Sequence, residues 1–203
     1  MNGILYQGEI FFPSKVVCVG RNYVEHIREL NNEVPGEPVL FIKPNSAIAD
    51  ELILPELPCR FEGELSFLIK KGQLSAVAFG LDLTLGELQN QLKAKGLPWE
   101  RAKAFDGSAL FSEFRPVVPA DLPELRLELW LNGLLQQQGV PEQMIYPPFV
   151  LLEAIRRCFT LEDNDVVMTG TPSGVKELIQ GDRLRGLIFL RNKLLIEREW
   201  LVQ

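Results

Sequence analysis

The clearest chemical signal in this sequence is a pair of glutamates, Glu62 and Glu64, in the stretch FEGEL (61–65). Alternate residues of a β-strand share a face, so the two carboxylates are expected to lie side by side. Like charges at that separation repel unless one carboxylate takes a proton or a cation lies between them. Hard cations such as Mg²⁺ prefer oxygen ligands of this kind. The pair therefore indicates a metal site, although a bare Glu-x-Glu is also common on a solvated strand face.

Two further ionisable residues stand in apolar surroundings. Asp82 lies in GLDLT (80–84), within an otherwise apolar strand, and could supply a third carboxylate. Its local sequence equally fits a helix N-cap or a turn residue. Lys103 lies among apolar and small residues in WERAKAFDGS (99–108). A lysine there is either buried against an anion or extends its ammonium to water along an apolar surface.

The single histidine, His26, precedes Glu29 by three residues in CVGRNYVEHIREL (18–30). Residues three apart on a helix face the same side. A carboxylate bonded to an imidazole fixes the tautomer and raises the basicity of the ring, which makes a general base that can activate water. The alternative is a surface histidine in a charged helix. The loop GTPSG (170–174), with Thr171, could hold a carboxylate through backbone N–H groups, or could be a plain turn.

Composition narrows the class of protein that carries these residues. The chain has 203 residues, a formal net charge of −6 and 46% hydrophobic residues, which predicts one domain with a full core. An acidic chain argues against nucleic acid as a partner. No apolar run approaches the roughly 20 residues of a membrane span, and the N-terminus lacks the pattern of a secretory signal. Three widely spaced cysteines form no disulfide framework and indicate a reducing cytoplasm, with Cys18 and Cys158 as small core residues.

Short strands dominate the expected elements. Apolar or alternating runs, ended by glycine or proline, predict strands. Asn132-Gly133 and Arg191-Asn192 are the expected hairpin turns. The segments expected to contain strands are 15–20, 39–44, 64–72, 125–133, 165–174 and 187–199.

Three helices are expected between the strands. The first, 22–30, would be capped by Asn22. The second, 84–96, would begin with a capping box formed by Thr84 and Glu87 and end at a glycine. The third would open at Pro147 and Pro148. Its apolar face would comprise Phe149, Leu152, Ile155 and Phe159. Because strands outnumber helices, the predicted class is α+β, mainly β.

Taken together, the blocks of sequence around these residues resemble the fumarylacetoacetate hydrolase family. The resemblance runs from about residue 15 to residue 182 and is closest to short single-domain members that act on acylpyruvates or oxaloacetate. The blocks, in chain order, are CVGRNY, HxxE, EPVLFIKP, ExE, LDLT followed by glutamine, GLPWxxAKAFD, NG, MIY and GTPSGV.

The resemblance implies a fold and an assembly. The expected fold is a β-rich roll with short peripheral helices, formed by a single catalytic domain over 1–203 in which 1–14 is a short N-terminal extension. Members of the family are usually homodimers. The implied cofactor is Mg²⁺, with Mn²⁺ as the alternative, and the implied partner is a small keto acid.

The resemblance also implies roles for individual residues. The metal ligands would be Glu62, Glu64 and Asp82. The catalytic residues would be His26 and Glu29, as a water-activating dyad on a lid helix, and Lys103, which would contact substrate oxygens. The substrate-binding residues would be Arg21, Gln89 and Thr171.

The implied reaction is hydrolysis of a C–C bond in an acylpyruvate-type β-diketo acid through a metal-stabilised pyruvate enolate. The same site could serve an oxaloacetate decarboxylase or a keto–enol isomerase. A reading from another class is a catalytically silent dimeric binding protein.

The sequence departs from the family pattern at several positions. Gly86-Glu87 replaces an arginine and an aspartate that relatives commonly have, and Lys176-Glu177 replaces a frequent Gly-Pro. Phe61 stands where relatives often have histidine or tyrosine. We expect these changes to alter the choice of substrate more than catalysis itself.

Overall fold

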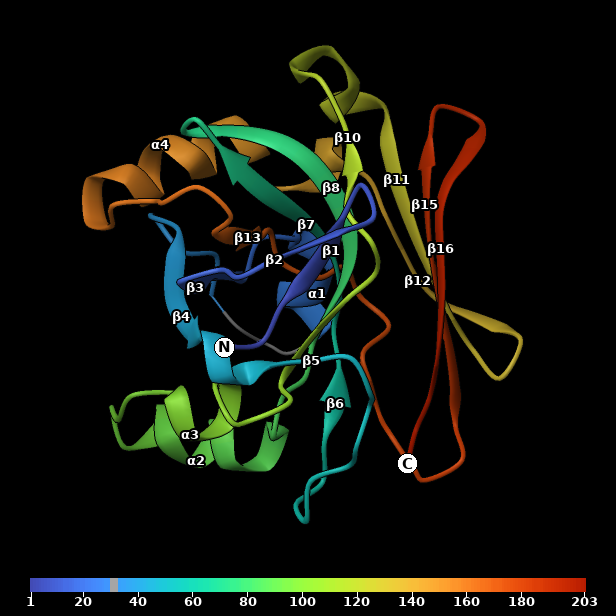
Figure 1. The fold of residues 1–203 in the computed structure, drawn as a ribbon. Coiled ribbons are helices and arrows are strands. Elements are labelled where there is room, and N and C mark those ends of the chain that lie inside the picture. The colour runs from blue at the N-terminus through green and yellow to red at the C-terminus, as the bar shows by residue number, and fades with distance from the viewer. Residues whose placement is uncertain (30–32) are drawn as a thin grey trace.

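The computed structural model describes residues 1–29 and 33–203, and a curled eight-stranded sheet forms the centre of this part of the chain (Figure 1). The strands follow the order β4-β3-β13-β7-β8-β9-β5, and β10 pairs with β8. Neighbours are antiparallel except for two parallel pairs, β13 with β3 and β5 with β9. The bounds are β3 (Lys15–Gly20), β4 (Val39–Pro44), β5 (Ile48–Ala49), β7 (Gly63–Lys70), β8 (Gln73–Asp82), β9 (Ala109–Phe111), β10 (Arg115–Pro116) and β13 (Val166–Met168).

A second sheet of four strands packs against β7 and β8 and forms a separate layer in Figure 1. Its order is β12-β11-β15-β16, with β11 (Leu125–Leu131), β12 (Leu134–Gly139), β15 (Arg183–Leu190) and β16 (Lys193–Leu201). Leu125, Leu127 and Leu129 alternate with less buried residues and face the core. A β-carbon on Gly186 would lie 2.5 Å from the ring of Phe79, so glycine permits the two layers to approach closely.

Two short ribbons complete the strands. β1 (Ile4–Tyr6) pairs with β2 (Glu9–Phe11), and Ile4 is buried in a core cluster with strands of the main sheet. β6 (Arg60–Phe61) pairs with β14 (Lys176–Glu177). The second ribbon brings residues 60–61 beside the loop that follows β13, and thus beside the start of β7 and its glutamates.

The helices of the described residues include α4 at one end of the main sheet and α2 and α3 together at the opposite end (Figure 1). They are α1 (Val24–Glu29), α2 (Gly86–Ala94), α3 (Glu100–Lys103) and α4 (Pro148–Cys158), with 3₁₀ turns at Asn45–Ala47, Pro119–Glu124 and Pro141–Gln143. None of the described helices is long and apolar enough to cross a membrane. The predicted fold class, mainly β with short peripheral helices, is confirmed.

Local turn signals predicted the elements well. Asn132 and Gly133 both adopt positive φ, 50° and 81°, in the turn between β11 and β12. Arg191, with φ of 57°, turns the hairpin of β15 and β16. α4 begins at Pro148, as expected, because the missing N–H of proline costs nothing in the first turn of a helix.

The predicted helix caps were wrong. Asn22 does not cap α1, because its amide donates to the main-chain oxygens of Tyr146 and Thr169 and its Oδ1 accepts from the Tyr146 N–H. The capping box of Thr84 and Glu87 is absent, since α2 begins at Gly86 without a side-chain cap. In both cases a tertiary contact took the polar side chain away from the helix terminus.

Two predicted core residues are exposed. Phe149 is 43% exposed because the buried stripe of α4 runs through residues 148, 151, 152 and 155 and leaves it at the edge. Cys158, the last residue of the helix, is also exposed. Cys18, in contrast, is buried in β3 as predicted.

Candidate active site

Three carboxylates meet where β7 and β8 pair. Glu62 immediately precedes β7, Glu64 lies in β7, and Asp82 is the last residue of β8. The Asp82 N–H donates to the Glu62 carbonyl at 2.8 Å, which holds the two strands in register at this point. One oxygen from each carboxylate lies within 4.8 Å of the others, and Glu64 and Asp82 are buried. The structure thus brings together the three side chains proposed from the sequence, and their role as metal ligands stays a prediction.

Two buried lysines contact the carboxylates. Lys103 Nζ donates to Glu62 Oε2 at 2.8 Å, Asp82 Oδ2 at 2.7 Å and Thr84 Oγ1 at 2.6 Å. Lys43 Nζ lies 2.8 Å from Asp82 Oδ1. Sequence reasoning missed Lys43, although a lysine within the apolar strand VLFIKP is the same kind of signal that singled out Asp82. Both lysines compensate negative charge that would otherwise be buried unpaired.

The pKa values show an excess of negative charge. Burial raises the pKa of Glu64 well above its usual value, and the charges of Asp82 and Glu62 raise it further. Burial alone would raise the pKa of Glu62, but the Lys103 ammonium and His26 outweigh it and hold this pKa low. Although burial opposes it, the carboxylates of Asp82 and Glu62 raise the pKa of Lys103. Three carboxylates face two lysines, so a further cation at this cluster would offset the negative charge that raises the pKa of Glu64.

The carboxylate cluster fits a divalent cation. Among the described residues, no group donates a hydrogen bond to buried Asp82 Oδ1, despite the ammonium nearby. Glu64 Oε2 accepts one bond, from the Gly170 N–H at 2.7 Å. Clustered carboxylate oxygens with spare lone pairs are the donors that Mg²⁺ and Mn²⁺ prefer. A bound cation would also supply the missing positive charge.

The imidazole and carboxylate of α1 form the expected pair. His26 Nδ1 lies 3.0 Å from Glu29 Oε2, and the histidine is buried while Glu29 is one-third exposed. Glu29 also accepts from the Gly174 N–H at 3.1 Å, which ties the helix to the loop after β13. A carboxylate at Nδ1 favours the tautomer with hydrogen there and leaves Nε2 with a free lone pair.

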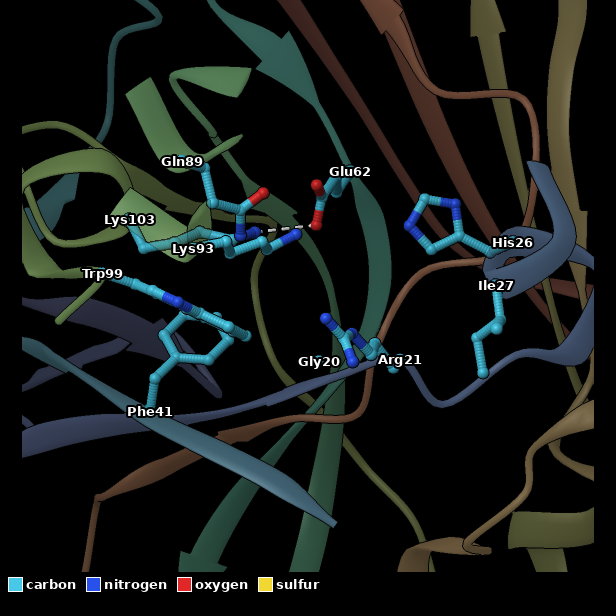
Figure 2. Close-up of a pocket in the computed structure, with 10 residues that line it drawn as sticks. All are labelled: Gly20, Arg21, His26, Ile27, Phe41, Glu62, Gln89, Lys93, Trp99 and Lys103. Atoms are coloured by element: carbon cyan, nitrogen blue, oxygen red, sulfur yellow. Dashed lines mark hydrogen bonds and ion pairs between the residues drawn. The ribbon is translucent and has the colours of Figure 1, made fainter. Parts of the chain in front are cut away.

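One pocket collects most of the predicted site residues (Figure 2). The imidazole of His26 faces Glu62 across this space, and Lys103 and Gln89 lie beyond Glu62. Trp99 and Phe41 close one side, with ring centroids 6.2 Å apart. The full lining is Gly20, Arg21, His26, Ile27, Phe41, Glu62, Gln89, Lys93, Trp99 and Lys103.

Arg21 and Lys93 give the pocket a positive rim. Arg21 adopts a left-handed φ of 57°, and its buried Nε finds no hydrogen-bond partner in the described part of the chain. Such strain is typical of functional positions. Burial lowers the pKa of Lys93, and the neighbouring charge of Arg21 lowers it further. Sequence reasoning missed Lys93, although it follows Gln89 by one helical turn and therefore shares its face.

Thr171 lies apart from this pocket. Its hydroxyl donates to the Gly63 carbonyl at 3.0 Å and accepts from Gln137 Nε2 at 2.8 Å. Both bonds serve the contact between β7 and the loop after β13. A substrate-binding role for Thr171 therefore stays a prediction.

The departures from the family pattern lie together in space. Lys176 pairs with Phe61, and Glu177 pairs with Arg60, in the ribbon of β6 and β14. A β-carbon on Gly86 would lie 2.6 Å from Arg60 Nε, so the side chain of Arg60 covers this glycine. The unusual residues thus form one structural feature beside the candidate site.

Comparison with known proteins identifies relatives of this chain. The family profile described as fumarylacetoacetate (FAA) hydrolase C-terminal matches residues 15–195. The chain is 41% identical to oxaloacetate tautomerase YcgM of Escherichia coli, over 88% of this chain and 91% of that protein. It is 35% identical to the human mitochondrial oxaloacetate tautomerase FAHD1, over 83% and 84% of the respective chains.

A solved structure of another member of this group of proteins is also similar to this chain. A crystal structure of fumarylpyruvate hydrolase from Pseudomonas aeruginosa, in complex with Mn²⁺ and pyruvate, matches with a TM-score of 0.88. The sequence identity is 30%, and the match covers 99% of this chain and 95% of the other. The similarity therefore extends over nearly the whole chain.

Proposed function

Since this chain belongs to the fumarylacetoacetate hydrolase family, a family of enzymes, we propose that it is a divalent-metal-dependent tautomerase that interconverts the keto and enol forms of oxaloacetate. The observation that carries the proposal is a pocket lined by His26, Lys103 and Glu62, where Glu62 belongs to the carboxylate cluster that it forms with Glu64 and Asp82. The 41% identity to a tautomerase of oxaloacetate supports the choice of reaction. Mg²⁺ and Mn²⁺ are the proposed metals, held by Glu62, Glu64 and Asp82.

When bound, the metal would polarise the keto group and stabilise the negative charge that develops on its oxygen. Lys103 uses its three N–H groups on Glu62, Asp82 and Thr84, so it would bind a substrate oxygen by exchanging one of these bonds, and its positive charge would stabilise negative charge on that oxygen. Arg21 and Lys93 would attract the anionic substrate into the pocket. Phe41 and Trp99 would limit the access of water on one side.

His26 is the proposed base. Its Nε2 would take a proton from C3 of the keto form, and the electron pair left behind would form the C2–C3 double bond. The oxygen on C2, which gains the electron pair of the C=O bond, then takes up a proton from water, and His26 returns its proton to water. The reverse steps return the keto form. Glu29 would hold the imidazole in the required tautomer and stabilise its charged form.

Hydrolysis of an acylpyruvate is the second candidate. The observation that favours it is the His26–Glu29 pair, because the same base could take a proton from water as the water attacks the distal acyl carbon. The C–C bond would then break, and the products would be pyruvate and a carboxylic acid. The similarity to fumarylpyruvate hydrolase supports this reaction, at 30% identity compared with 41% for the tautomerase.

The two reactions are separated by their products. We would incubate the purified protein with oxaloacetate in D₂O, with EDTA or with Mg²⁺, and follow deuterium at C3 and release of pyruvate by NMR. A tautomerase exchanges C3 hydrogen without forming pyruvate, whereas a decarboxylase forms pyruvate from oxaloacetate. A hydrolase forms pyruvate from acetylpyruvate.

The variant His26→Gln should lower the exchange rate about a hundredfold to ten-thousandfold, the usual contribution of a general base. Glu25→Gln is the matched control, because Glu25 lies in the same helix and pairs with exposed Arg28. Binding of Mg²⁺ without turnover of any of these substrates would favour a catalytically silent binding protein. We further propose a homodimer, which light scattering would test.

A further inference from the structure

The side chain of Arg60 occupies the space above a helical glycine. The main chain of Arg60 is fixed by two hydrogen bonds with Thr84, at 2.8 and 3.0 Å. A β-carbon built on Gly86 would lie 2.6 Å from Arg60 Nε and 2.7 Å from its Cζ. Any side chain at position 86 would therefore displace the guanidinium. The glycine and the rigid backbone together determine where this positive charge lies.

This position continues the polar face that α2 presents to the pocket. Gly86, Gln89 and Lys93 are separated by three and four residues, so they follow one face of the helix. Gln89 and Lys93 line the pocket (Figure 2). Arg60, seated over Gly86, thus adds a guanidinium at the beginning of the same row.

The region around this row is suited to an anion. Arg21, Lys93 and Lys103 line the pocket, where Glu62 is the one acidic residue among the described lining residues and is bound by Lys103. Burial lowers the pKa of Lys93, and Arg21, Lys103 and Arg60 add to this effect through their charges. Arg60 itself lines a neighbouring open pocket with Glu29 and Glu177, and its place over Gly86 puts it beside the helix whose Gln89 and Lys93 line this one.

The guanidinium of Arg60 keeps its donors available. Its side chain donates no hydrogen bond to any residue in the described ranges 1–29 and 33–203. Its one ion-pair partner in this part of the chain, Glu177, lies 3.8 Å from Nε and has a side chain that is 53% exposed, so this contact is weak. A guanidinium whose N–H donors are not already bonded can bind a carboxylate through two parallel hydrogen bonds.

We propose that Arg60 determines the substrate specificity of this enzyme by binding the second carboxylate of a dicarboxylic keto acid, the one that does not join the keto group at the metal site. The inference rests on the proposed function and deepens it. Glu177 would hold the guanidinium loosely until the substrate carboxylate replaces it. Keto acids without the second carboxylate would lose this contact.

The test compares oxaloacetate with its C4 methyl ester, which lacks the second charge. Arg60→Ala should raise KM for oxaloacetate about tenfold to a hundredfold, the usual effect of losing a hydrogen bond to a charged group. The KM for the ester and kcat for both substrates should change less than about threefold. Arg183→Ala is the control, because Arg183 is exposed and lies at the start of β15.

A second variant separates recognition from structure. In Arg60→Ala/Gly86→Arg the new side chain has the space that Arg60 vacates, so an arginine returns to the same place from the helix. We expect this double variant to recover at least half of the lost discrimination between oxaloacetate and the ester. Equal losses for both substrates, or no recovery in a double variant with unchanged circular dichroism, would overturn the proposal.

Failure of the proposed function would be recognised separately. If the unmodified protein turns over neither substrate, calorimetric titration of the Mg²⁺-loaded protein with malate and with lactate replaces the kinetic assay. Malate carries a second carboxylate, and lactate lacks it. Weaker binding of malate alone in Arg60→Ala would support the role of Arg60, whereas an unchanged ratio of the two affinities would exclude it.

Discussion

Replacing Glu64 by glutamine should stabilise the metal-free protein at neutral pH. Glu64 is buried, and its carboxylate lies within 4.8 Å of oxygens of Glu62 and Asp82. At that distance two like charges repel by about 3.5 kcal/mol at an effective dielectric constant of about 20. Glutamine has nearly the same shape and can still accept the hydrogen bond from the Gly170 N–H, but it carries no charge.

The size of the effect should depend on pH. Because the pKa of Glu64 in the folded protein lies well above the unfolded value of about 4.3, folding takes up a proton between these two values. The contribution of Glu64 to stability is therefore complete below the unfolded pKa and is lost as the pH rises through the folded pKa. Glutamine does not titrate, so the variant does not lose this stability. Its free energy of unfolding, relative to that of the unmodified protein, should grow by about 1.4 kcal/mol per pH unit between the unfolded and the folded pKa of Glu64.

Urea unfolding between about pH 4.5 and pH 8, with EDTA present, measures this difference. Glu56→Gln is the control, because Glu56 is exposed in a loop. Saturating Mg²⁺ should reverse the order of stability. At a hundred times its Kd, the ion would stabilise the unmodified protein by about 2.7 kcal/mol, and the variant, with one carboxylate fewer, should gain much less.

Two results would refute this reasoning. A stability difference that does not change with pH would mean that Glu64 is ionised in the metal-free protein and that the lysines already balance it. An equal gain from Mg²⁺ in both proteins would mean that Glu64 is not a metal ligand.

Three other substitutions test the framework around the site. Lys43→Met should lower the free energy of unfolding of the metal-free protein by about 3–5 kcal/mol in urea unfolding, since it removes one of the two buried ion pairs of Asp82, and a loss below about 1 kcal/mol would contradict this. Gly170→Ala should lower the free energy of unfolding by about 1–3 kcal/mol, which would appear as a lower Tm. The φ of Gly170 is 95°, and the new β-carbon would lie 2.8 Å from Asn22 Cβ. Asp165→Asn should lower the free energy of unfolding by about 1.5–3 kcal/mol at neutral pH. Hydrogen bonds from Lys15 and nearby groups stabilise the carboxylate more than burial destabilises it, and they hold the pKa of Asp165 low. This last loss should fade as the pH falls through the folded pKa, and a pH-independent loss would contradict it.

The elements of the fold were predictable where short-range signals act alone. The turn at Asn132-Gly133 and the start of α4 at Pro148 follow from φ preferences that hold in any context. The predicted caps at Asn22 and Thr84 failed because distant segments bind these side chains. A polar side chain can satisfy either a helix end or a tertiary partner, and the local sequence does not say which.

The sequence by itself determined the chemical groups of the candidate site. The Glu-x-Glu spacing aims two carboxylates at one point, and the i, i+3 spacing joins His26 to Glu29, because backbone periodicity fixes both relations. Only the tertiary structure decided that Lys43 faces Asp82 and that Arg60 covers Gly86. Each of these pairs joins different elements, and their distances depend on how strands pair and layers pack, which no local spacing encodes.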